Sequence, residues 1–115
     1  MNDRELLELA ARAAGMNIQR SRLDDPLHRD FLMNGEGVRN PGQCSFPWNP
    51  LTDDGDALRL AVKLNLTVSV CGEFTKVSYG WGEGIIEYAN ESKDAATCRA
   101  IVRAAAIMGE MLCRL

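Results

Sequence analysis

The apolar residues near the start of the chain recur every three or four positions and predict an amphipathic helix over residues 3–14. Asn2 is placed to cap this helix, and Glu5 stands three residues later, as a capping box requires. Gly15 suits the left-handed position that ends a helix. The predicted buried stripe consists of Leu6, Leu7, Ala10, Ala11 and Ala14.

A second helix is predicted over residues 53–64, where the helical spacing returns. Thr52 is placed to cap it, because its hydroxyl can accept a hydrogen bond from a free backbone N–H in the first turn. Asp53, Asp54 and Asp56 put negative charge where the helix dipole is positive. The predicted buried face consists of Ala57, Leu58, Ala61, Val62 and Leu64.

The pattern then changes to an alternation of apolar and polar residues, which predicts three strands. These strands cover residues 66–71, 76–81 and 85–89. The connections at 72–74 and 82–84 have hairpin length, so the strands should form an antiparallel meander.

Helical spacing resumes over residues 93–114 and predicts a long last helix, capped by Ser92 or Asn90. Gly109 lies inside this helix, where glycine costs about 1 kcal/mol relative to alanine. We therefore expect close packing against another element at that position. The predicted apolar stripe consists of Cys98, Ile101, Val102, Ala105, Met108 and Leu112.

Residues 16–50 carry turn and breaker signals and are predicted to form a long irregular loop. A short strand or helical turn is an option around residues 31–33. Phe46 and Trp48 are expected to pin the far end of the loop to the core. A segment of this length without regular structure is unusual in a compact domain and is often functional.

This element order predicts a single α+β domain over residues 1–115. Helices bury their apolar stripes on a sheet, and three helices can cover both of its faces. The expected architecture is a three-layer α/β/α sandwich around a small antiparallel meander, in the order helix, long loop, helix, three strands, helix.

Composition narrows the class of protein without naming an activity. The chain has 115 residues, 46% of them hydrophobic and 25% charged, which is typical of a globular domain. Its net charge of −3 disfavours nucleic acid as a partner, because phosphate binding usually needs a basic patch. No apolar run approaches the roughly 20 residues that span a bilayer. A cytoplasmic location without membrane association is therefore expected.

The four cysteines lie in different predicted elements and form no C-x-x-C pair, which favours reduced thiols over a zinc site. His28 is the only histidine, and Asp24, Asp25 and Asp30 lie near it in the sequence. A carboxylate-oriented general base, or a Cys44–His28 nucleophile pair, can be drawn from these residues. Proximity in sequence shows no geometry, so a solvated loop histidine is favoured and no catalytic residue is assigned.

Two short motifs resemble ligand sites but have structural explanations. The acidic run 53–56 begins like a calcium loop, yet the twelfth position, which should be a glutamate, is Leu64. The glycines of residues 80–84 lie between two predicted strands with no helix start after them, which indicates a hairpin turn rather than a phosphate cradle. No metal and no cofactor are predicted.

Aromatic residues are the candidates for an interaction site. Trp48, Tyr79, Trp81 and Phe46 would form a binding anchor if they were exposed together, because aromatics dominate interface energetics. The alternative is that they fill the core beside the sheet, and this alternative is favoured for Trp48.

Three stretches of the chain carry a family resemblance. They are WNPLTD at 48–53, ALRLAVKL at 57–64 and ATCRAIVRAA at 96–105. Together they resemble the phage ABA sandwich domain, a family of small proteins from tailed bacteriophages and prophages. The resemblance covers residues 46–107 and, more loosely, the first helix. It implies an α/β/α sandwich and no established activity, and residues 16–45 exceed the family pattern.

These observations favour a small non-enzymatic phage or prophage accessory protein that acts by binding a host or phage protein. Self-association into a homodimer is expected with it. The alternative is a small-ligand binder or enzyme with a site under residues 16–47, which a deep polar pocket would reveal. A nucleic-acid-associated protein is a third hypothesis, and the net charge of −3 argues against it.

Overall fold

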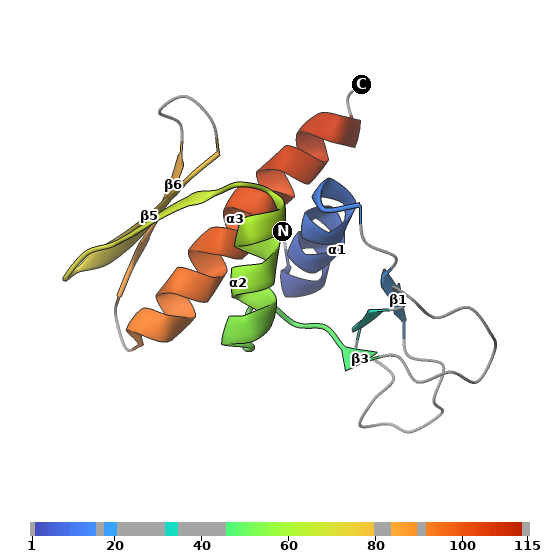
Figure 1. Ribbon diagram of the computed structural model, residues 1–115, viewed down its shortest axis with the longest axis horizontal. Helices are drawn as coiled ribbons and strands as arrows, with labels where there is room; N and C mark the ends of the chain where they lie inside the picture. The colour runs from blue at the N-terminus through green and yellow to red at the C-terminus, as the bar shows by residue number, and fades with distance from the viewer. Residues whose placement is uncertain are drawn as a thin grey trace.

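The computed structural model describes residues 2–15, 18–20, 32–34, 46–79, 84–89 and 92–113. Its helices are α1 (Asp3–Ala13), α2 (Asp54–Lys63) and α3 (Lys93–Cys113). Its strands are β1 (Ile18–Arg20), β2 (Leu32–Asn34), β3 (Phe46–Pro47), β4 (Thr67–Val70), β5 (Phe74–Ser78) and β6 (Gly84–Tyr88). Figure 1 shows α3 crossing the middle of the molecule, with β5 and β6 on one side and α1 on the other.

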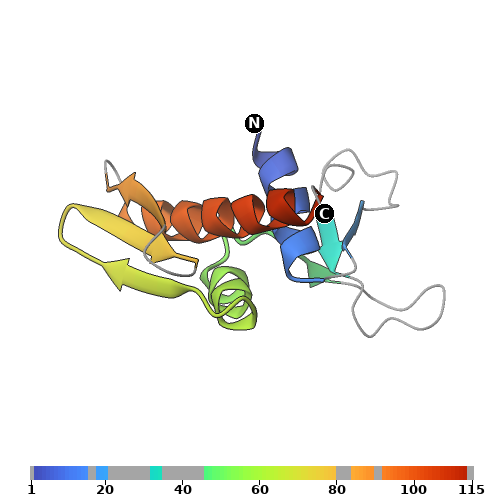
Figure 2. The same cartoon turned by 90° about the horizontal axis from the view of Figure 1, so that it is seen from above.

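Helix α3 is the centre of the fold. It packs against α1, α2, β5 and β6, and Figure 2 shows these elements distributed along and around it. Ala100, Ile101 and Val102 are buried on successive faces of the helix, followed by residues 104–106. A helix that is apolar around most of its circumference is one that other elements enclose.

The contact between α1 and α3 is made by small residues and is very close. Ala10 and Ala11 on α1 and Ala105 on α3 are buried. A methyl group added to Gly109 would overlap the backbone carbonyl of Leu9. Glycine is therefore required where α1 crosses α3, and the predicted close packing at this position is confirmed.

Helix α1 begins and ends as its sequence indicates. The side chain of Asn2 accepts a hydrogen bond from the backbone N–H of Glu5 at 2.9 Å, which confirms Asn2 as the cap. Gly15 has a φ of +65°, the left-handed conformation expected after the helix. Ser92 caps α3, because its hydroxyl accepts from the N–H of Ala95 at 3.2 Å.

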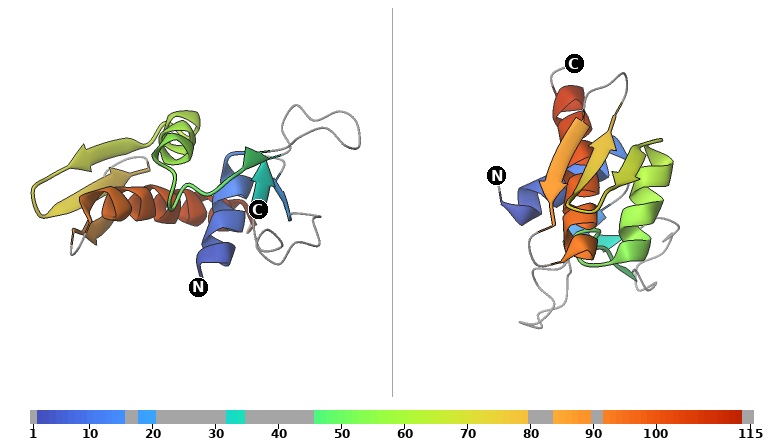
Figure 3. Two further views of the ribbon diagram at one scale, coloured as in Figure 1. Left: turned by 90° about the horizontal axis from the view of Figure 1, so that it is seen from below. Right: turned by 90° about the vertical axis from the view of Figure 1, so that its left-hand side faces the viewer.

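Strands β4, β5 and β6 form the predicted antiparallel meander, in that order. Thr75 and Val77 on the central strand are fully buried toward α3. Because side chains alternate along a strand, Phe74, Lys76 and Ser78 face the opposite side. Figure 3 shows that outer face turned away from the three helices.

Two polar contacts attach the meander to α3. The hydroxyl groups of Thr75 and Thr97 lie 2.9 Å apart. Thr97 donates to the carbonyl oxygen of Lys93, so Thr75 is the donor in the hydroxyl pair and is satisfied despite its burial. Glu87 of β6 forms an ion pair with Arg103 of α3. These contacts fix which face of the sheet meets the helix.

The cap of α2 differs from the prediction. Asp53, not Thr52, caps the helix, because its carboxylate accepts a hydrogen bond from the N–H of Asp56 at 2.9 Å. Thr52 belongs to the preceding turn, and its hydroxyl lies 3.5 Å from the carbonyl oxygen of Asn49. Both residue types are good caps, and the helix begins one residue later than its pattern indicated.

The buried face of α2 was predicted correctly at Ala57 and Ala61 and wrongly at Leu58 and Val62. Leu60 is buried instead, while Leu58 is 63% and Val62 is 67% exposed. A stripe through 57, 60 and 61 has the same helical spacing as the predicted one but is rotated around the helix axis. Packing on α3 selects the rotated stripe.

The stripe of α3 was also only partly correct. Cys98, Ile101, Val102 and Ala105 are buried as predicted, and Met108 is half-buried. Leu112 is exposed, because the last turn of α3 extends past the elements that enclose its middle.

The strand boundaries shift slightly from their predicted positions. Strand β5 begins at Phe74, two residues early, because the N–H of Cys71 bonds to the carbonyl oxygen of Phe74 and closes the hairpin there. Strand β6 begins at Gly84 and includes the last residue of the predicted second connection.

The segment 16–50 contains a small second sheet that the sequence pattern did not reveal as a whole. Strand β2 takes the strand option suggested near residues 31–33 and pairs antiparallel with β1 and β3. Strands of two or three residues are too short for alternation to be recognised. The remainder of this segment lies outside the described residues.

The α+β class and the order of the main elements are confirmed. A helix, a second helix, a three-stranded antiparallel meander and a long last helix follow one another, and the last helix packs on α1 and on the strands. Where the chain is described, α3 covers the inner face of the meander and no helix covers its outer face.

Candidate protein-interaction site

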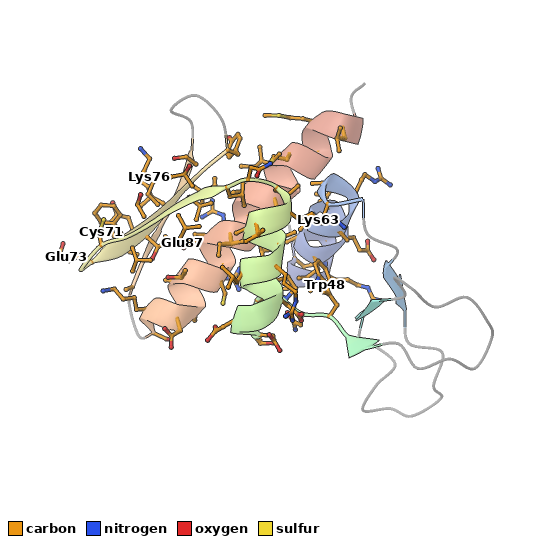
Figure 4. All side chains as sticks on the ribbon, viewed as in Figure 1. Trp48, Lys63, Cys71, Glu73, Lys76 and Glu87 are labelled. Carbon is orange, nitrogen blue, oxygen red and sulfur yellow. The ribbon has the colours of Figure 1, made fainter. Side chains whose placement is uncertain are left out.

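Two of the four predicted aromatic side chains, Trp48 and Tyr79, lie within the part of the chain that the structure describes. Trp48 is 4% exposed and belongs to the core cluster, and Figure 4 places it between α1 and α2. Tyr79 is half-buried against the same core. Trp81 and the side chain of Phe46 lie outside the described residues. Of the two that are described, Trp48 is structural and Tyr79 presents only part of its ring.

The motif that starts at Trp48 builds the entrance to α2. The side-chain oxygen of Asn49 accepts a hydrogen bond from the N–H of Leu51 at 3.1 Å. The backbone carbonyl oxygen of Asn49 accepts another from the N–H of Asp53 at 2.9 Å. The carboxylate of Asp56 accepts from the N–H of Asn49 at 3.0 Å. The aromatic, the turn and the acidic run are therefore one architectural unit, and Asp53 and Asp56 act as helix-start groups.

A groove of about 300 Å³ lies between α2, β4 and the first half of α3. Its walls are mainly apolar and include Leu58, Val68, Val70 and Ile101. Asp54, Lys93 and Asp94 lie at the end where both helices begin. The sequence pattern did not predict this groove. Leu58 lines it because α2 is rotated about its axis relative to the predicted orientation, and tertiary packing determines that rotation.

The thiol of Cys98 lines this groove and is not activated. Its sulfur donates a hydrogen bond to Asp54 Oδ1 at 3.3 Å. Burial, and then the hydrogen bond and negative charge of Asp54, raise the pKa of Cys98 from its ordinary value of 9.0 to about 11. A nucleophilic cysteine needs a lowered pKa, so this environment opposes thiolate chemistry.

The outer face of the meander carries an aromatic pair, in which Tyr88 is exposed and Phe74 is half-buried. Phe74 and Tyr88 are directly opposite in the register, with ring centroids 6.3 Å apart and planes tilted by 59°. This geometry is within the favourable range for aromatic pairs. Tyr88 is 65% exposed, and its neighbour Ile86 on the same face is 45% exposed.

Lys76 is the one charged side chain on this face among the described strand residues. It stands between Ser69 and Ile86 in the register. In Figure 4 Lys76 points away from α3, whereas Glu87 lies on the helix side of the sheet. We name Phe74, Lys76, Ile86 and Tyr88 the outer patch.

Part of the signal for the outer patch was present in the sequence. Alternation over 85–89 separates Ile86 and Tyr88 from Ile85 and Glu87, but it does not show which set faces water. Phe74 was predicted to lie in a connection, which hid its pairing with Tyr88. Neither residue was among the candidates.

The remaining candidate chemistry falls mostly outside the described residues. His28, Cys44 and residues 80–83 are in this group, as is the space under residues 16–47 proposed for a ligand. Cys71 and Cys98 carry free thiols. Among the described residues, no three acidic, histidine or cysteine side chains gather as metal ligands would.

Comparison with protein-family models, with curated proteins and with solved structures finds no match to this chain. Within the described ranges, no helix combines the length and the apolar character that crossing a bilayer requires.

Proposed function

We propose that this protein is a small, non-enzymatic accessory protein of phage or prophage origin that acts by protein–protein interaction in the cytoplasm of a bacterial host. The resemblance of residues 46–107 to the phage ABA sandwich domain supports the origin. The observation that supports the interaction is the outer patch, where Tyr88 and Ile86 stand exposed on a sheet face beside the half-buried ring of Phe74.

The composition of the outer patch specifies the partner's chemistry. Tyrosine and phenylalanine supply large contact area at low cost in conformational entropy and are frequent hot spots. Lys76 adds one positive charge beside them. The partner is therefore a host or phage protein that presents an apolar surface with a carboxylate facing Lys76.

An affinity capture from bacterial host lysate, read by mass spectrometry, tests this function. The bait is the tagged full chain, beside the variants Tyr88→Ser and Met111→Ser. Met111 is the matched control, because it is a large exposed apolar residue at the far end of α3. We expect a protein that the parent and Met111→Ser enrich and that Tyr88→Ser loses.

Charge provides the second arm of the same experiment. Lys76→Glu should reduce recovery of the captured protein, because it places like charges opposite each other. If every captured protein is recovered equally by Tyr88→Ser, or if nothing exceeds a tag-only control, the outer patch is not an interaction site.

A further inference from the structure

Among the described strands, β4 is an edge of the meander, and its own sequence carries none of the residues that usually protect an edge. It is the terminal strand of the meander, and its sequence is Thr-Val-Ser-Val, with no charge, proline or glycine. Native proteins normally blunt exposed edges with charges, prolines, bulges or very short strands. The opposite edge, β6, has such a device, because Glu87 is a charge that points inward to Arg103.

The free backbone groups of β4 belong to its two valines. The N–H of Cys71 bonds to Phe74 and therefore points toward β5. In an antiparallel ladder the direction of the backbone N–H and C=O groups alternates from residue to residue, so those of Ser69 and Thr67 also point toward β5. The N–H and C=O groups of Val68 and Val70 then point away from the sheet, where no further described strand pairs with β4.

Apolar side chains continue from this edge onto α2. Val70 is 56% exposed, and Leu58 and Val62 stand four residues apart on one face of α2. Leu58 and Val70 line the same groove. An added strand would therefore meet backbone hydrogen-bonding groups and an apolar surface together.

We propose that β4 pairs with β4 of a second copy of this chain, antiparallel and about a two-fold axis through Ser69. Val68 of each copy then lies opposite Val70 of the other, and their outward N–H and C=O groups form the ladder. Ser69 faces its own counterpart. The two three-stranded meanders become one continuous six-stranded sheet.

Charge complementarity identifies the occupant as a second copy. Helix α2 has acidic side chains at its start, Asp53 and Asp54, and a basic residue in its last turn, Lys63. A two-fold axis perpendicular to the sheet makes the two α2 helices antiparallel. The acidic start of each helix then lies toward the basic end of the other.

This assembly goes beyond the proposed function, because it uses the edge of the sheet rather than its outer face. Both outer patches remain on the same side of the joined sheet. Pairing between copies and binding of another protein are therefore separate events with separate tests.

Sedimentation velocity over a range of protein concentrations gives the first test. We expect the full chain to form dimers and Val70→Lys to raise their dissociation constant by about 100-fold, since each lysine would place a charge opposite Val68 of the other copy, on an apolar part of the joined sheet. Ile86→Lys is the matched control, because it places the same charge on an exposed apolar residue of β6, at the opposite edge of the sheet from β4. Its dissociation constant should stay unchanged.

Cross-linking tests the register. Residues that face each other in a non-hydrogen-bonded pair have Cα atoms about 4.5 Å apart, which a disulfide can span. In a Cys71→Ser background, Ser69→Cys should therefore form an intermolecular disulfide between the introduced thiols of the two copies on mild oxidation, identified by peptide mapping. Ser78→Cys, on the central strand β5, should not form an intermolecular disulfide under the same conditions.

A chain that is monomeric at all concentrations overturns the proposal. So does a dimer that Val70→Lys leaves intact, or one in which Ser78→Cys cross-links as well as Ser69→Cys, because another surface then joins the copies. Capture of a host protein by the parent and by Val70→Lys alike would preserve the proposed function while this inference fails.

Discussion

The two sides of α3 are built on opposite principles. On one side, α1 meets α3 through alanines and Gly109 and leaves no space between the backbones. On the other, α2 approaches α3 through Ala57, Leu60 and Ala61, and an open apolar groove remains between α2, β4 and α3. Small side chains permit close packing where the backbones themselves meet, as at Gly109, whereas beside β4 they leave surface for something else to cover.

The largest expected difference in the free energy of unfolding is between substitutions of two leucines of α2, Leu60 and Leu58. Leu60→Ala should lower the free energy of unfolding by about 3 kcal/mol, because the side chain is buried beside α3. Leu58→Ala should cost less than about 0.5 kcal/mol, because Leu58 faces the groove and water. Urea denaturation of both variants gives the two values. Equal losses would place α2 in a different rotation.

Substitution of Gly109 tests the close packing of α1 against α3. Gly109→Ala should cost about 2 kcal/mol, since overlap with the backbone of Leu9 outweighs the roughly 1 kcal/mol that alanine gains in a helix. Gly72→Ala is the control, because a methyl group there meets nothing within 4 Å. A stabilised Gly109→Ala variant would show that α1 does not cross α3 at this point.

The entrance to α2 gives a smaller effect. Asp53→Ala should destabilise the protein by about 1 kcal/mol, because the N–H of Asp56 loses its acceptor. Thr52→Ala should change stability by no more than a few tenths of a kcal/mol. Thermal unfolding of the two variants under identical conditions compares them, and a larger loss for Thr52→Ala would restore threonine as the cap.

The smallest effect is expected in the groove and depends on pH. Burial and Asp54 raise the pKa of Cys98 to about 11 in the folded protein, against an ordinary value of 9.0. Below pH 9 the thiol is protonated in both states, and between pH 9 and 11 only the unfolded chain loses the proton. Stability should therefore fall as pH rises through this window, by up to about 1 kcal/mol at pH 10.

Comparison with Cys98→Ala isolates this contribution from the other groups that titrate at high pH. The difference in unfolding free energy between parent and variant should shrink from pH 8 to pH 10. A difference that stays constant would mean that Asp54 does not hold the thiol in its protonated form.

Local signals predicted the parts of the fold that depend on nearby residues. Asn2, Gly15 and Gly109 each need a particular chemistry at a particular position, and each was placed correctly. The choice between Thr52 and Asp53 was not decided by sequence, because adjacent residues both had capping oxygens.

Features that depend on distant contacts were harder to predict. Two stripes of α2 have helical spacing, and only the approach of α3 determines that Leu60 rather than Leu58 is buried. The pairing of Phe74 with Tyr88 depends on where β5 begins, which is two residues earlier than predicted. The outer patch depends on such distant contacts, so it was not predicted from the sequence, whereas the order of the main elements was.

The contact between α1 and α3 joins residues that are about 100 positions apart in the sequence, and this has a consequence for folding during synthesis. Leu9 lies against Gly109, and Asp3 forms an ion pair with Arg99 at 3.3 Å. At roughly 5–20 residues per second, the ribosome needs about 5–20 s to add the approximately 100 residues between these positions. During that time the apolar stripe of α1 has no partner on α3, so the native core closes only after the residues around Gly109 have been synthesised.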